Sequence, residues 1–192
     1  MNRKTAFYAL MALWFLIIAS YTAYKELQLR TGDEVMLRVM PVDPRDIFRG
    51  DYIILYYEIT SITEEQKIVG RYGEDDILYN NEKVYIMLLK DGKYYKGGDI
   101  YKTRPEKGLF IAGTVSAGKN FDSPVDREYA SIIYGIENFF VAEGEGKEIE
   151  SAINRNKVSA KIVIDTYGNA SIKELYIDEK KVDFKNKNEK ID

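Results

Sequence analysis

The sequence of 192 residues contains no cysteine and no histidine, and it has only four prolines. Without cysteine the chain forms no disulfide and carries no lipidated thiol. Without histidine it cannot build Ser-His-Asp or Cys-His nucleophilic machinery, a His-ligated transition-metal site or His-based acid–base catalysis. The remaining options are carboxylate chemistry, a Ser-Lys or tyrosine site, and a hard cation held by oxygen ligands. We expect no cofactor.

Charge is also missing from one long segment near the N-terminus. Twenty consecutive residues, TAFYALMALWFLIIASYTAY from Thr5 to Tyr24, carry no charged side chain. At a rise of ~1.5 Å per residue such a helix is ~30 Å long, which matches the hydrocarbon core of a bilayer. The sequence therefore predicts an N-terminal transmembrane anchor over residues 1–25.

The charges beside this segment predict its orientation. Arg3 and Lys4 precede the segment, whereas Lys25 and Glu26 cancel after it. By the positive-inside bias the N-terminus is then cytoplasmic and the C-terminal domain extracytoplasmic. A cleaved signal peptide is the alternative, but a bulky Tyr21 stands where a cleavage site requires a small residue.

The rest of the chain is rich in short runs of β-branched and aromatic residues that end at Gly, Asp and Asn. These runs predict a mainly β fold, an antiparallel sandwich or open barrel, with one short additional helix near residues 148–156. The expected divisions are a neck over 26–33, a β-rich domain over 34–178 and a charged tail over 179–192. Within the domain, Asp91-Gly92 predicts a hairpin with a type I′ turn, and 63–69 suggests a short helix.

One stretch, RGDYIILYYEI, places a charged turn directly against an apolar run. Alternation puts Ile53, Leu55, Tyr57 and Ile59 on one face of a strand over 51–60, and Tyr52, Ile54, Tyr56 and Glu58 on the other. Since both faces are apolar, the pattern predicts a central strand covered on two sides, or a strand whose second face is a tyrosine-lined surface.

The same stretch carries a family resemblance. Gly50, Asp51, Tyr52, Leu55 and Tyr57 spell G-D-Y-x-x-L-x-Y, and the chain resembles the GDYXXLXY family of bacterial and archaeal membrane-anchored proteins. The upstream PVDPRDIFRG and the later YGIENFFVAEGEG are also similar to that family. The resemblance implies a membrane-anchored accessory protein, often associated with a polytopic membrane partner, and no established activity.

A docking surface is the function that the motif region favours. Arginine and tyrosine are enriched at protein interfaces, and both occur here among alternating acidic side chains. An ion-pair network that pins the turn is the structural alternative, and carboxylate catalysis is disfavoured because the arginines hold the carboxylates ionised. The candidate partner- or ligand-binding residues are Asp43, Arg45, Asp46, Arg49, Asp51, Tyr52 and Tyr56.

The residues favour three other functions less. An anchor followed by an exported β-domain is similar to type I signal peptidases, which are Ser-Lys proteases. However, Val42 occupies the position of the nucleophilic serine. Lys83 or Lys90 could act as the base only if a serine faced it, and Ser61, the nearest candidate, lies outside the nucleophile segment. Glu137, Glu143 and Glu145 are weak candidates for a Ca²⁺ site. Nucleic acid is not expected, because the net charge is −3 and acidic residues interleave with basic ones.

The sequence thus predicts an extracytoplasmic interaction or accessory module, without catalysis, whose partners are the lipid bilayer and a polytopic membrane protein.

Overall fold

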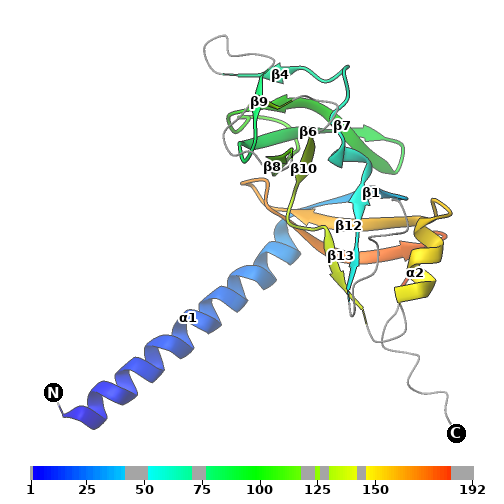
Figure 1. The fold of residues 1–192 in the computed structure, drawn as a ribbon. Coiled ribbons are helices and arrows are strands. Elements are labelled where there is room, and N and C mark those ends of the chain that lie inside the picture. Colours follow the sequence, from blue (N-terminus) through cyan, green and yellow to red (C-terminus); the bar gives the residue numbers. More distant parts are fainter. Residues whose placement is uncertain are drawn as a thin grey trace, which may run out of the picture.

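The computed structural model of the protein describes residues 2–41, 52–70, 77–117, 124–125, 130–141 and 146–182. A long helix projects from a β-rich body built of two stacked sheets (Figure 1). Helix α1 spans Arg3–Thr31 and α2 spans Gly146–Ile153, with one 3₁₀ turn, η1, at Glu58–Thr60. The mainly β architecture and the short second helix are confirmed.

Fourteen strands are present in the described part of the chain. In chain order they are β1 (Asp33–Met40), β2 (Tyr52–Ile54), β3 (Tyr56–Tyr57), β4 (Ile68–Val69), β5 (Leu78–Tyr79), β6 (Lys83–Asp91), β7 (Tyr94–Tyr101), β8 (Phe110–Ser116), β9 (Pro124–Val125), β10 (Ser131–Ile133), β11 (Asn138–Phe140), β12 (Val158–Ile164), β13 (Ala170–Ile177) and β14 (Lys180–Lys181).

Two five-stranded sheets form the body. One has the order β14-β13-β12-β1-β3 and the other β10-β8-β6-β7-β4, and two further pairs join β11 to β2 and β5 to β9. All pairings are antiparallel except that of β4 with β7. The sheets are open and not closed into a barrel, and one continuous apolar core joins them. Inward residues of β1, namely Val35, Leu37 and Val39, are buried in this core as the alternation predicts.

The predicted hairpin over β6 and β7 is confirmed, but its turn lies one residue later than expected. Asp91 pairs with Tyr94, so the two-residue loop is Gly92-Lys93. Only Gly92 of this loop has a positive φ, of 63°. A glycine with positive φ at the first loop position is typical of a type II′ turn rather than the predicted type I′.

The prediction of one continuous strand over 51–60 is wrong. The chain there divides into β2, β3 and η1, which pair with different neighbours: β2 with β11, and β3 with β1 at the edge of a sheet. The inward face is confirmed, with Ile53, Leu55, Tyr57 and Ile59 all buried. The opposite face is not covered, because Tyr56 is 39% exposed.

Strand β12 is central in its sheet, and only Lys161 among its residues is not buried. Two smaller expectations differ from the structure. Residues 63–69 contain a turn and the short strand β4 instead of a helix. The strand pairing continues past residue 178, since β14 folds back on β13.

The segment expected as a neck is part of α1, which continues to Thr31 and meets β1 through Gly32 alone. Gln28 is 5% exposed, and its Nε2 donates to the carbonyl oxygen of Asn169 at 3.1 Å. The Tyr24 hydroxyl and Gln28 Nε2 also lie at 3.4 and 3.5 Å from Asp165 Oδ2. The last turns of the helix are therefore fastened to the β12–β13 turn.

We predict that Gly32→Ala destabilises the protein. A Cβ at this position would lie 2.4 Å from Val163 Cγ1 and 2.7 Å from the Ile164 carbonyl oxygen, so buried β12 would have to shift. Such overpacking costs about 1–3 kcal/mol, measurable as a lower thermal midpoint in detergent. Thr31→Ala, at an exposed neighbouring position, is the control; equal midpoints for the two variants would contradict the prediction.

The outer face of the first sheet carries a ladder of ion pairs centred on Glu174. Its carboxylate accepts hydrogen bonds from Lys181 Nζ at 2.6 Å and the Tyr176 hydroxyl at 2.5 Å, and Lys161 Nζ lies 3.1 Å away. The hydrogen bond from Lys181, then those from Tyr176 and Lys161, lower the pKa of Glu174 to about 2. The charged form of Glu174 is therefore favoured in the folded protein.

This shift predicts a pH dependence of stability. Because the folded pKa is lowered, the contribution of Glu174 is complete above its ordinary value of 4.5 and is lost as the pH falls from there towards 2. Wild type should thus lose more of its free energy of unfolding over this range than Glu174→Gln does. Urea unfolding at a series of pH values measures the difference, and parallel curves would refute it.

Candidate functional site

The described part of the GDYXXLXY motif forms a buried clamp with the loop between β10 and β11. The Leu55 amide donates to the Glu137 carbonyl oxygen at 2.7 Å, and the Tyr57 hydroxyl donates to the Ile136 carbonyl oxygen at 2.8 Å. In return, the Tyr134 hydroxyl donates to the carbonyl oxygen of Ile59 at 2.5 Å. Two tyrosines thus cross-link the segments 55–59 and 134–137 reciprocally.

Both clamp tyrosines are kept neutral by their surroundings. Burial, with the nearby Glu137 carboxylate as a second cause, raises the pKa of Tyr57 and of Tyr134. The phenols therefore act as hydrogen-bond donors to backbone carbonyl groups. The Glu137 carboxylate accepts hydrogen bonds from the backbone N–H groups of Tyr134 and Gly135, at 2.5 and 2.9 Å. These bonds stabilise the conformation of the loop.

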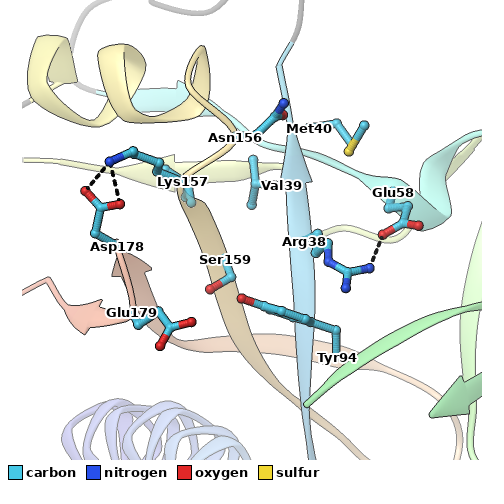
Figure 2. Close-up of a pocket in the computed structure, with 11 residues that line it drawn as sticks. Arg38, Val39, Met40, Glu58, Tyr94, Asn156, Lys157, Ser159, Asp178 and Glu179 are labelled. Atoms are coloured by element: carbon cyan, nitrogen blue, oxygen red, sulfur yellow. Dashed lines mark hydrogen bonds and ion pairs between the residues drawn. The ribbon is translucent and has the colours of Figure 1, made fainter. Parts of the chain in front are cut away.

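An open recess of about 470 Å³ lies at the end of β1 remote from the helix. It is bordered by β1, the start of β7, the loop between α2 and β12, and the β13–β14 turn (Figure 2). Its lining is a mixture of charged, polar and apolar side chains from segments far apart in the sequence: Arg38, Val39, Met40, Glu58, Tyr94, Asn156, Lys157, Val158, Ser159, Asp178 and Glu179.

Arg38 contacts three other residues at the recess. Its Nη1 lies 3.2 Å from Glu58 and 3.4 Å from Asp91, and its guanidinium sits 4.4 Å from the centre of the Tyr94 ring. The hydrogen bond to Glu58, then that to Asp91, raises the pKa of Arg38. Arg38 therefore joins β1 to η1 and to the β6–β7 hairpin with its charge fixed.

The opposite wall is shaped by left-handed backbone. Asn156 ends the turn after α2 with φ 55°, and Asp178 and Glu179, the two loop residues of the β13–β14 hairpin, have φ 49° and 67°. Two positive φ values in a two-residue loop are typical of a type I′ turn. Lys157 Nζ pairs with Asp178 at 2.8 Å (Figure 2), and Lys93 pairs with Glu179. The lining charges described here thus have partners within the protein.

Two exposed apolar side chains stand at the edge of the recess. Met40 lines it and is 42% exposed, and Tyr56, opposite Met40 in the β1–β3 pairing, is 39% exposed. In the sequence, the segment predicted as a docking surface begins at Asp43, three residues after Met40. A polarizable methionine and a tyrosine beside an arginine have the composition of a protein-binding surface.

The predicted site residues are placed only in part. Asp43, Arg45, Asp46, Arg49 and Asp51 lie outside the described residues. Tyr52 pairs through its backbone with Phe140, and Tyr56 is exposed beside Met40. The sequence did not identify Arg38, Tyr94 or Lys157, because each is an ordinary residue within or next to a strand, β1, β7 and β12 respectively.

The described residues do not form the arrangement that a metal site or a Ser-Lys protease requires. No group of three or more Asp and Glu side chains close enough to hold a metal ion occurs within the described ranges, and Glu143 and Glu145 lie outside them. Ser61, the nearest alternative to the missing nucleophile of a Ser-Lys protease, forms an isolated β-bridge with Ser131. In the described part of the molecule, neither Lys83 nor Lys90 hydrogen-bonds to Ser61.

The fold and the clamp define a small two-sheet β-domain carried on a long apolar helix. The chain belongs to the family of GDYXXLXY proteins, whose family model matches residues 14–175. No curated protein and no solved structure matches the chain. The match includes residues 14–31 of α1 and the strands from β1 to most of β13, so the family model covers helix and β-domain together.

We predict that Tyr57→Phe lowers the free energy of unfolding by about 1–3 kcal/mol, because the buried Ile136 carbonyl loses its donor. Tyr56→Phe removes a hydroxyl one residue away on the exposed face and should leave the free energy unchanged. Chemical denaturation of both variants tests the difference. Similar stabilities for the two would mean that the clamp hydrogen bond contributes little.

Proposed function

We propose that the protein is a single-pass membrane-anchored accessory module whose extracytoplasmic β-domain docks a polytopic membrane partner. The observation that carries the proposal is the exposure of α1. The helix is long and apolar enough to cross a membrane, and no residue of its most apolar stretch is buried against the body. Phe15 and Leu16, for example, are 76% and 63% exposed. A bilayer removes this apolar surface from water.

The attachment of the helix supports a retained anchor over a cleaved signal peptide. Tyr24 and Gln28 hydrogen-bond to the β12–β13 turn, so the end of the helix is part of the folded domain. Cleavage after Tyr24 would remove the contact of Tyr24 with Asp165 and would leave Gln28 near a new chain end, where helices fray. Arg3 and Lys4 before the stretch support a cytoplasmic N-terminus.

The docking role rests on the end of the molecule remote from the helix. Met40 and Tyr56 are exposed there beside Arg38, and the chain between Met40 and Tyr52 contains the two arginines and three aspartates of the predicted surface. We propose that Arg38, Met40 and Tyr56 contact the partner at this end, together with the arginines and aspartates of the predicted surface. Catalysis is not part of the proposal.

A small ligand in the recess is the second candidate. Its volume of about 470 Å³ falls within the usual range of ligand pockets. However, the ion pairs of Arg38 and Lys157 would have to open before these cations could bind an anionic ligand. The recess therefore fits better as one part of a larger protein contact.

We predict that the full-length protein, purified from native membranes in mild detergent, retains a stoichiometric polytopic partner identifiable by mass spectrometry. Tyr56→Ala and Arg49→Ala should each weaken this complex at least several-fold, because aromatic and arginine side chains carry most of the energy of an interface. Tyr79→Ala is the matched control, since Tyr79 is 37% exposed and Tyr56 is 39% exposed.

Thermal unfolding of the same variants separates binding from stability. If Tyr56→Ala and Arg49→Ala unfold early yet bind normally when folded, the region has a structural role and the docking proposal fails. Purification of the bait alone would count against a partner. Intact-mass measurement of the purified protein would contradict a retained anchor if residues of α1 are missing.

A further inference from the structure

We propose that the base of the β-domain is a lipid-binding surface that lies in the headgroup layer of the bilayer crossed by α1. We define this basal surface by Lys25, Arg104, Phe140 and Tyr167. The inference rests on the membrane anchor of the proposed function, and it adds an interaction that the anchor alone does not require.

Two recesses on the basal surface flank the last turns of α1. The larger, about 420 Å³, lies between Lys25 and the residues of β11, including Phe140. The smaller, about 170 Å³, lies between Leu27 and the β12–β13 turn, including Tyr167. The β12–β13 turn (orange) and β11 (yellow-green) stand on either side of the C-terminal end of α1 (Figure 1). The helix thus enters the domain with protein on both sides.

The depth of this surface follows from the length of the helix. The apolar stretch ends at Tyr24, and Lys25 to Gln28 rise ~6 Å beyond it at ~1.5 Å per residue. The headgroup region adds roughly 5–7 Å to each side of the hydrocarbon core. Residues that line the recesses with Lys25 and Leu27 are therefore at headgroup level when the apolar stretch fills the core.

The exposed side chains at this level suit a lipid interface. Phe140 is 76% exposed and Tyr167 is 59% exposed, and aromatic rings concentrate at the boundary of hydrocarbon and headgroups. The Arg104 guanidinium lies 4.9 Å from the centre of the Tyr167 ring, and Lys25 borders the recess of Phe140. Each aromatic ring thus has a cation nearby that matches a lipid phosphate.

The junction keeps the basal surface at the bilayer. Only Gly32 separates α1 from β1, and Gln28 is buried against the β12–β13 turn. Without a linker, the domain cannot swing Phe140 and Tyr167 into bulk water while α1 stays in the membrane.

Tryptophan fluorescence in lipid vesicles tests both the anchor and the basal surface. Trp14 is the single tryptophan of the chain and lies within the apolar stretch, so wild type reports on insertion of α1. Two double variants report on the two sides of the end of α1. They are Trp14→Phe with Phe140→Trp, and Trp14→Phe with Tyr167→Trp. Trp14→Phe with Leu89→Trp is the control, because Leu89 is 48% exposed and lies in β6 of the other sheet.

The full-length variants are reconstituted into vesicles of phosphatidylcholine and phosphatidylglycerol, with no other protein present. We expect tryptophan at positions 140 and 167 to be quenched by lipids brominated near the headgroup. With iodide on both sides of the vesicle, quenching at these two positions should be several-fold weaker than at position 89. Circular dichroism of each variant confirms the fold.

The outcomes separate the two proposals. If lipids brominated at the ends of their acyl chains do not quench Trp14 in wild type, the anchor and the proposed function that depends on it fail. If these lipids quench Trp14 but iodide reaches positions 140 and 167 as readily as position 89, the anchor stands and the lipid-binding surface is overturned. Shielding in vesicles of lipid alone excludes a protein partner as its cause.

Discussion

The whole arrangement depends on the direct junction of an apolar helix with the first strand of a β-sheet. Because Gly32 is the only residue between α1 and β1, and because its site has no room for a side chain, the helix packs directly onto β12. Buried Gln28 then satisfies the Asn169 carbonyl at the same place. These contacts fix which face of the domain is the base and which end projects away from it.

The periodic parts of the fold could be predicted from sequence because one buried face leaves a clear alternation. Val35, Leu37 and Val39 show it in β1. Prediction failed over 51–60, where a run that is apolar on both sides cannot show where the chain changes partners. The change occurs at Leu55, whose amide bonds to the Glu137 carbonyl instead of to a sheet neighbour. That interaction spans 82 residues and has no local signal.

The recess could not be predicted from the sequence either, because its residues come together from distant segments. Arg38 and Tyr94 are ordinary strand residues until the β6–β7 hairpin brings the ring beneath the guanidinium. Lys157 and Asp178 meet only because two turns adopt left-handed backbone. By contrast, alternation placed Tyr56 on the face opposite Tyr57, and Tyr56 is exposed while Tyr57 is buried; a binding role for Tyr56 stays a prediction.

The alternation of buried and exposed residues divides the motif into positions that pack the domain and positions on its surface. Leu55 and Tyr57, two named positions of the motif, are buried and hold the clamp, so a match to the motif is evidence for the packing of 55–59 against 134–137. Tyr56 is an unnamed position between them and is exposed. A different residue there would change the surface without disturbing the clamp. The named positions of the motif can therefore specify the packing of the domain, while a side chain between them, such as Tyr56, can vary on the surface.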